Sequence, residues 1–223
     1  MNKSLKNVAI ISAMAFVISL VSCDSSNDPD PVVSTIISDL NADYAPYESP
    51  LPTNRPPNRV GAKNKFTLLS FKTGQIVPNT DSATNKWDIG FRSTTIIVNS
   101  GTSGPGTSTA QIISGTLDNL AEAPVDGYKS DNKNATTVIE RNAIPTGSGN
   151  GWYTYVASTN LVSPIAGKVI VVKTSDGRYA KLEILSYYKG APANPTPEPA
   201  GTDKDRYYKF RYVYQPNDTR SFQ

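Results

Sequence analysis

The residue types that this chain lacks restrict its chemistry more than those it contains. There is no histidine among its 223 residues, the two methionines are Met1 and Met14, and the one cysteine is Cys23. Nucleophilic catalysis by serine or cysteine depends on a neighbouring base that is most often histidine, and structural zinc is held by histidine and cysteine. The sequence therefore excludes a histidine-based catalytic triad, a His/Cys zinc site and an internal disulfide bond.

The remaining polar residues form no recognisable catalytic pattern. The glycine-rich segment 99–109 (NSGTSGPGTST) has no lysine in the P-loop position, and the chain contains no Gly-x-Ser-x-Gly sequence. A pair of carboxylates of the glycosidase kind can be assembled in space from 19 acidic residues, but spacing along the chain does not reveal such a pair. We therefore do not expect an enzyme.

The N-terminal residues indicate where the protein is located. Lys3 and Lys6 precede an apolar run over 8–21, which is 14 residues long and shorter than the roughly 20 residues that span a bilayer. Such a run is typical of a signal peptide. It ends in Leu-Val-Ser-Cys, which resembles a bacterial lipobox, so we expect cleavage after residue 22 and lipidation of Cys23. The alternative is an ordinary secretory signal beside an unrelated cysteine. Two or more acyl chains would tether the folded part to a membrane without inserting it.

The mature chain is expected to hold one domain. Removal of 1–22 takes away two lysines, so the formal charge falls from +3 to +1, which gives no electrostatic case for binding nucleic acid. Residues 23–34 begin with a polar, acidic, proline-broken stretch that predicts a flexible tether. The remaining 35–223 are enough for one hydrophobic core.

Most of this domain is predicted to be β-strand. Only 34–42 (STIISDLNA) has a weakly helical pattern. Asp-Gly at 176–177 favours the positive φ values of a tight hairpin turn. We therefore expect an all-β, antiparallel, single-domain fold. The segments rich in β-branched and aromatic residues that predict strands are 65–71, 87–92, 95–98, 111–117, 137–140, 152–157, 168–174, 178–188 and 206–214.

Alternation along the last two segments predicts which face of the sheet is buried. Residues 180, 182, 184, 186 and 188 share one face, as in a half-buried strand, and Tyr208, Phe210, Tyr212 and Tyr214 share a face opposite charged residues. We interpret this tyrosine row as core packing, with a ligand-binding platform as the alternative. The long loops 45–58, 99–109 and 190–205 are where a binding site is expected.

Several segments, in their order and spacing, resemble the HmuY-type haem-binding lipoproteins of the Bacteroidota. The resemblance implies an all-β fold with long projecting loops, a lipid anchor in the outer membrane, and haem held between loops and passed to a TonB-dependent receptor without enzymatic activity. The acidic residues after Cys23 resemble the surface-export signal of that group, which implies display on the cell surface. The segments that carry the resemblance are 65–71 (KFTLLSF), 87–92 (WDIGFR), 94–99, 151–153, 163–165, 176–182 and 186–190.

The family resemblance also implies a haem pocket, whose usual ligands are missing here. Family members hold the iron between two histidines or two methionines, one of which lies just before a Val-x-Pro-Ile segment. The matching stretch places Asn160 at that position, and an amide is a poor ligand for haem iron. The other ligand is expected within 125–134, where Tyr128, Lys129 and Lys133 are the possible donors. Phenolate suits ferric iron, so Tyr128 is the candidate metal ligand. The resemblance places Tyr153 in the same pocket.

Three functions remain open at this point. The first is capture of haem or a related tetrapyrrole, held mainly by apolar and aromatic burial with one weak axial ligand or none. The second is capture of another ligand, such as an iron–siderophore complex, as an accessory to a transporter. The third is glycan binding through stacked aromatic rings, although Trp87 and Trp152 lie in predicted strands and are expected in the core. We predict the first function.

Overall fold

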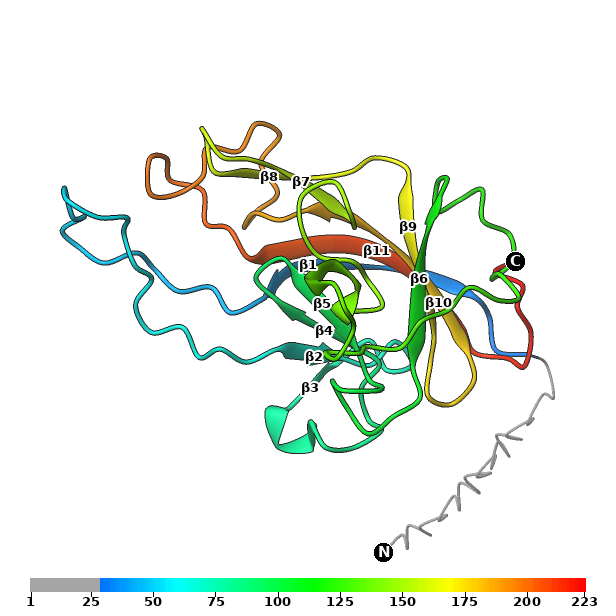
Figure 1. Cartoon of the computed structure of the whole chain (residues 1–223). Coiled ribbons are helices and arrows are strands. Elements are labelled where there is room, and N and C mark those ends of the chain that lie inside the picture. The colour runs from blue at the N-terminus through cyan, green and yellow to red at the C-terminus, as the bar shows by residue number, and fades with distance from the viewer. Residues whose placement is uncertain (1–28) are drawn as a thin grey trace, which may run out of the picture.

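Three antiparallel sheets make up the part of the chain that the computed structural model describes, residues 29–223 (Figure 1). The order in the five-stranded sheet is β1 (Val33–Asn41), β11 (Tyr207–Gln215), β10 (Tyr179–Ser186), β9 (Lys168–Lys173) and β6 (Thr109–Ser114). The four-stranded sheet has the order β3 (Ile76–Val77), β2 (Thr67–Leu69), β4 (Ile89–Arg92) and β5 (Thr95–Val98). The third is a hairpin of β7 (Tyr153–Val156) and β8 (Leu161–Pro164). The all-β prediction is confirmed.

The predicted Asp-Gly hairpin joins β9 to β10. Gly177 has φ +81° and its N–H donates to the Thr174 carbonyl at 3.0 Å. The Thr174 N–H donates to the Arg178 carbonyl at 2.8 Å, which closes the turn. Glycine adopts this left-handed conformation without steric cost, so the turn sequence sets the register of the two strands.

The main core lies where the five-stranded sheet packs against the four-stranded one. The Phe91 ring of β4 lies 5.0 Å from the Tyr208 ring and 5.3 Å from the Phe210 ring of β11, between ring centroids. Tyr208 and Phe210 are fully buried. Trp87 and Trp152 are buried as well. The interpretation of the tyrosine row as core is therefore confirmed.

The other face of the five-stranded sheet is covered too, so the expectation of a half-buried sheet is wrong. Lys181 lies on that face with only 4% of its surface exposed, and its Nζ donates to the carbonyls of Leu117 (2.7 Å) and Leu120 (2.8 Å). A long side chain can bury its stem when its charged end finds acceptors. The cluster that covers this face, the outer cluster, contains Leu117, Ala123, Val169, Val171, Val213 and Phe222.

Two local predictions are wrong. Segment 34–42, expected to be helical, lies almost entirely in strand β1, because Ile37 and Leu40 pack against the core while the strand pairs with β11, and this tertiary pairing overrides weak helical propensity. The strand begins two residues before the expected start of the domain. Segment 137–140, expected to be a strand, lies mostly within the short 3-10 helix η2 (Val138–Arg141), where Val138 and Ile139 are exposed.

The start of the glycine-rich loop 99–109 is held in place by the buried side chain of Asn99. Asn99 is fully buried, its amide donates to the carbonyls of Thr84 (2.9 Å) and Trp87 (2.8 Å), and its side-chain oxygen accepts from Gly106 N–H.

A second 3-10 turn, η1 (Asn79–Asp81), precedes β4. Over residues 29–223 we find no helix of the length and apolarity needed to cross a bilayer. The expected signal peptide (1–22) and Cys23 lie outside the described residues.

Candidate functional site

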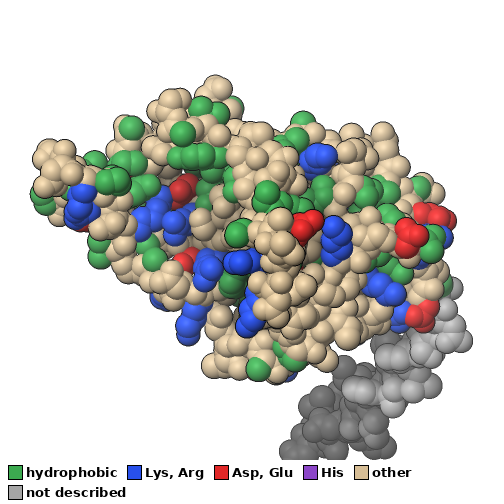
Figure 2. All heavy atoms as spheres, viewed as in Figure 1, with side chains coloured by type: hydrophobic (Ala, Val, Ile, Leu, Met, Phe, Trp, Pro, Cys, Tyr) green, Lys and Arg blue, Asp and Glu red, His purple; other side chains and the backbone are tan. Residues whose placement is uncertain are grey.

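The hairpin β7–β8 and the loops 45–58 and 190–205 project from the same end of the molecule, at the left of Figure 1. They enclose a hollow of about 330 Å³, which we call the loop cleft. Ligand pockets are generally about 300–1,000 Å³, so the cleft lies at the lower end of that range. Figure 2 shows basic and acidic side chains gathered in a hollow at this end. The residues that argue for a site here are Tyr47, Arg59, Tyr153, Tyr155, Asn160 and Arg206.

The hairpin supplies the aromatic wall of the loop cleft. Tyr153 is 8% exposed and its ring packs 4.9 Å from the ring of Trp152. Tyr155 is two residues further along the same strand and is 43% exposed. Its hydroxyl donates to Asn160 Oδ1 at 2.8 Å. Asn160 has φ +55° in the connection between the strands, a conformation that asparagine tolerates better than most residues. The turn geometry thus holds Asn160 beside Tyr155.

The floor of the cleft is charged. The guanidinium of Arg59 pairs with the carboxylate of Asp205 at 2.7 Å and lies 4.1 Å from the ring centroid of Tyr47. Arg206 donates from Nη1 to the Asp43 carbonyl at 3.0 Å. Burial raises the pKa of Asp205, although Arg59 and Arg206 act in the opposite direction. Among the described residues, Asp205 Oδ1 and Arg206 Nε are buried with no hydrogen-bond partner. Unsatisfied buried polar atoms are costly, so this floor is suited to a polar group of a ligand.

An apolar hollow of about 380 Å³ lies next to the cleft. It is formed by the same hairpin tip and the same loop 190–205, and Asn160 on the cleft side is flanked in sequence by Thr159 and Leu161 on the apolar side. The hairpin tip therefore has a polar, aromatic side and an apolar side. The residues of the apolar hollow are Ser158, Thr159, Leu161, Pro195, Thr196, Pro197, Ala200 and Gly201.

The structure brings together only two of the four predicted pocket residues. Tyr153 and Asn160 both line the loop cleft. Tyr128 instead packs on the outer cluster, with its ring 6.1 Å from that of Tyr179, and burial raises its pKa. Lys129 is exposed and its backbone pairs with Ala110 through two bonds of 2.9 Å. Tyr128 and Lys129 are therefore not part of the loop cleft.

Sequence reasoning missed the other residues of the cleft. Tyr155 carried a usable signal, because it lies two residues after Tyr153 in a predicted strand and so shares its face. No sequence signal pointed to Arg59 or Arg206, because each reaches the cleft from a distant part of the chain. The described residues contain no group of three or more His, Cys, Asp or Glu side chains arranged to hold a metal ion.

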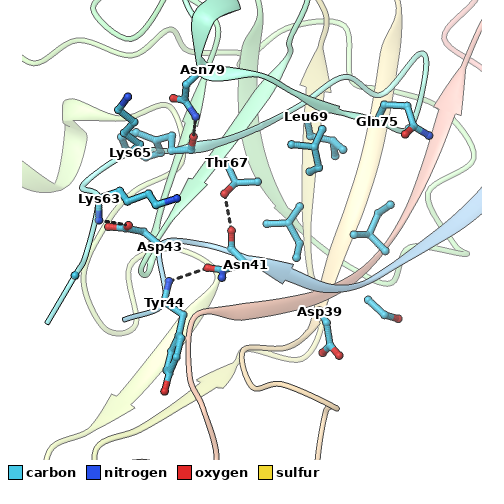
Figure 3. A pocket seen from close by; sticks show the side chains of 17 residues that line it. Asp39, Asn41, Asp43, Tyr44, Lys63, Lys65, Thr67, Leu69, Gln75 and Asn79 are labelled. Carbon is cyan, nitrogen blue, oxygen red and sulfur yellow. Dashed lines mark hydrogen bonds between the residues drawn. The ribbon is translucent and has the colours of Figure 1, made fainter. Parts of the chain in front are cut away.

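A second hollow, beside the edge strand β1, is larger at about 680 Å³ (Figure 3). Several of its polar side chains are hydrogen-bonded within the fold. Asp43 accepts from the N–H groups of Lys63 and Asn64, at 2.8 and 3.0 Å. Thr67 donates to the Asn41 carbonyl, and Asn79 donates to the Phe66 carbonyl. We call this hollow the edge groove. These hydrogen bonds hold segment 61–65 near the end of β1, so the loop cleft is the better candidate site.

Comparison with known proteins identifies the family. The model of the HmuY protein family matches residues 62–212, which is 151 of the 223 residues. The chain belongs to the HmuY family. No curated protein matches the chain.

Three solved structures are similar to this HmuY-family chain at low identity, each with a TM-score of 0.44. A protein from Bacteroides vulgatus ATCC 8482, described as HmuY-like and haem-binding, is 14% identical over 83% of this chain and 93% of its own. The apo HmuY analog of Tannerella forsythia is 16% identical over 86% of this chain and 100% of its own. A protein from Bacteroides fragilis NCTC 9343, described as a lipoprotein, is 13% identical over 82% of this chain and 91% of its own.

Proposed function

We propose that this protein binds haem or a related tetrapyrrole in the loop cleft and the adjoining apolar hollow, and that it is not an enzyme. The observation that carries the proposal is the family match over residues 62–212. The apolar side of the hairpin tip suits a flat macrocycle, and Arg206, whose Nε has no hydrogen-bond partner among the described residues, suits one of its carboxylates.

Burial alone can supply useful affinity for such a ligand. Each 100 Å² of apolar surface removed from water contributes about 2.5 kcal/mol. A tetrapyrrole offers several such units, from which the cost of association is subtracted. Strong iron ligation is therefore not required for binding, and this fits a cleft whose described lining contains no histidine or methionine.

The same proposal includes a lipid anchor at Cys23, a location at the outer surface of the outer membrane, and transfer of the ligand to a TonB-dependent receptor. The lipobox-like sequence supports the anchor. The first described residues lie beside the C-terminal segment, where Asn217 donates to the Asp30 carbonyl at 2.9 Å, at the end opposite the projecting loops (Figure 1). A chain anchored near this end would hold the loop cleft away from the membrane, accessible to a receptor.

Titration with porphyrins tests the binding function. A chain starting at Asp24 keeps every described residue and is titrated with haemin and with metal-free protoporphyrin IX, using an unrelated β-sheet protein as the control. We expect saturable binding of both pigments. The dimethyl ester of protoporphyrin IX, which lacks both carboxylates, is expected to bind at least about tenfold more weakly because Arg206 then has no carboxylate to pair with.

Porphyrin binding no tighter than to the control protein would contradict the proposal. Saturable binding of a ferric siderophore or a glycan in its place would then identify one of the other two functions that the sequence left open.

A further inference from the structure

Within the proposed haem-binding function, the residue types available decide which side chain can reach the iron. The usual protein ligands of haem iron are histidine, methionine, cysteine and tyrosine. Lysine is a further possible donor, but no lysine of the described chain lines the loop cleft. Residues 29–223 contain no histidine, methionine or cysteine, so tyrosine is the remaining type in the described chain. Four tyrosines line the loop cleft, namely Tyr47, Tyr153, Tyr155 and Tyr187.

Three of these four phenols are held by the fold. Tyr187 is 2% exposed, its hydroxyl lies 3.4 Å from Ser93 Oγ, and burial raises its pKa, which opposes phenolate formation. Tyr153 is 8% exposed and packs on Trp152. The face of the Tyr47 ring is covered by the guanidinium of Arg59. None of the three extends freely into the cleft.

Tyr155 differs from them in exposure and in its hydrogen bond. It is the most exposed tyrosine of the cleft at 43%, and its hydroxyl is held at 2.8 Å from the Asn160 side chain on the other side of the hairpin turn. The turn fixes the position of a phenol oxygen at the tip of a projecting element, next to the apolar hollow.

We propose that Tyr155 is the axial ligand of ferric haem in this protein and that Asn160 positions it. The phenol oxygen bonds to the iron of ferric haem hydroxide, and the phenolic proton leaves with the displaced hydroxide as water, so that charge and atoms balance. The iron stays ferric throughout. The inference rests on the proposed function and adds the identity of the ligating residue to it.

Asn160 is suited to this role because an amide carries both an acceptor and two donors. Its Oδ1 accepts from the neutral phenol in the present structure. A rotation of the amide by half a turn presents the Nδ2 hydrogens to the phenolate oxygen instead. Either orientation of the amide keeps a hydrogen bond to the Tyr155 oxygen, so Asn160 can hold that oxygen in position both before and after it binds iron.

Spectroscopic titration of the chain starting at Asp24 tests the assignment. Wild type is expected to give a high-spin ferric spectrum with a phenolate-to-iron charge-transfer band that disappears on reduction with dithionite. Tyr155→Phe is expected to lose this band and to bind haemin at least about tenfold more weakly. Its affinity for metal-free protoporphyrin IX is expected to stay unchanged within about twofold, because that pigment has no iron to ligate. Circular dichroism confirms that the variant is folded.

Two matched controls make the same substitution elsewhere. Tyr47→Phe removes another phenol of the cleft, and Tyr128→Phe removes the phenol that packs on the outer cluster. Both are expected to keep the charge-transfer band. Asn160→Ala is expected to keep the band but to weaken haemin binding, because the phenol loses the hydrogen bond that positions it.

Each result separates the ligand assignment from the binding function. Unchanged haemin affinity and spectrum in Tyr155→Phe would overturn the assignment, and so would loss of the band in Tyr47→Phe or Tyr128→Phe. In either case binding of metal-free protoporphyrin IX would leave the proposed function intact. Failure of wild type to bind either pigment would overturn the proposed function, and the assignment with it.

Discussion

Asp88 shows how one buried carboxylate sets the response of the fold to pH. It is 7% exposed, and its Oδ2 accepts from the Phe71 N–H at 2.9 Å. Burial raises its pKa to about 6, the Asp176 carboxylate acts in the same direction, and the N–H groups of Phe71 and Ser175 oppose the shift. A carboxyl whose pKa is raised on folding stabilises the protein fully below its unfolded pKa, and this stabilisation is lost as the pH rises through about 6.

We therefore expect Asp88→Asn to raise the free energy of unfolding at pH 7.5 by up to about 3 kcal/mol, because a neutral amide avoids the cost of a buried charge. The gain is expected to shrink towards zero near pH 4, where the folded carboxyl is already protonated. Urea unfolding of the variant and of wild type at about ten pH values measures this difference in the free energy of unfolding. Asp126→Asn, at an exposed aspartate, is the control and should change stability by less than about 0.5 kcal/mol. A gain that grows towards low pH would contradict the interpretation.

Lys181 gives a second prediction at the scale of one residue. Its ammonium group caps the carbonyls of Leu117 and Leu120 and lies 4.9 Å from the ring centroid of Phe222. Lys181→Met keeps the apolar stem and removes the donors, so two buried carbonyls lose a partner. We expect a loss of about 1–3 kcal/mol in the free energy of unfolding, measured by urea unfolding. Lys173→Met, on exposed Lys173 of β9, is expected to cost less than about 0.5 kcal/mol, and an equal loss in both would refute the capping role.

At the scale of elements, the glycine-rich loop is built against the segment around Asp131. Gly101 has φ +57°, and a Cβ placed there would lie 1.9 Å from the Asp131 carbonyl oxygen. Gly101→Ala therefore combines backbone strain with a clash against backbone, and we expect a loss of at least about 2 kcal/mol in thermal or urea unfolding. Gly149→Ala is the matched control, because φ is +82° there with nothing within 4 Å of the added Cβ. It is expected to cost only about 1 kcal/mol. Equal losses would show that the close approach to Asp131 is unimportant.

Elements with strong local signals were predictable, and those made by distant contacts were not. Strand β5 and the β9–β10 hairpin follow from β-branched residues and from Asp-Gly, which act locally. Strand β1 was mistaken for a helix because its identity depends on pairing with β11, more than 160 residues away in the chain. The candidate site follows the same rule. Asn160 and Tyr153 came from motifs near the hairpin, whereas Arg59 and Arg206 meet only after the loops have been placed by the sheets.

The whole molecule consists of a packed body and a projecting end, and this division predicts which segments a ligand protects. The buried strands β10 and β11 carry the core, while the hairpin β7–β8 and the loops 45–58 and 190–205 form the loop cleft. A ligand that binds only the folded state raises the free energy of unfolding by RT ln(1 + [L]/Kd), which is about 2.7 kcal/mol at a hundred times Kd. In strands whose amide hydrogens exchange only through global unfolding, the exchange rate falls by the factor that corresponds to this free energy.

Hydrogen exchange with and without protoporphyrin IX tests this division. We expect uniform slowing of β10 and β11 and, in addition, new protection at the hairpin and the two loops, because a ligand in the loop cleft would contact these segments and hold them together. The strand β1 and segment 61–65, which border the edge groove of Figure 3, are expected to gain none beyond the global factor. Protection confined to that groove would move the binding site from the projecting end to the edge of the five-stranded sheet, and would leave Tyr155 with no part in it.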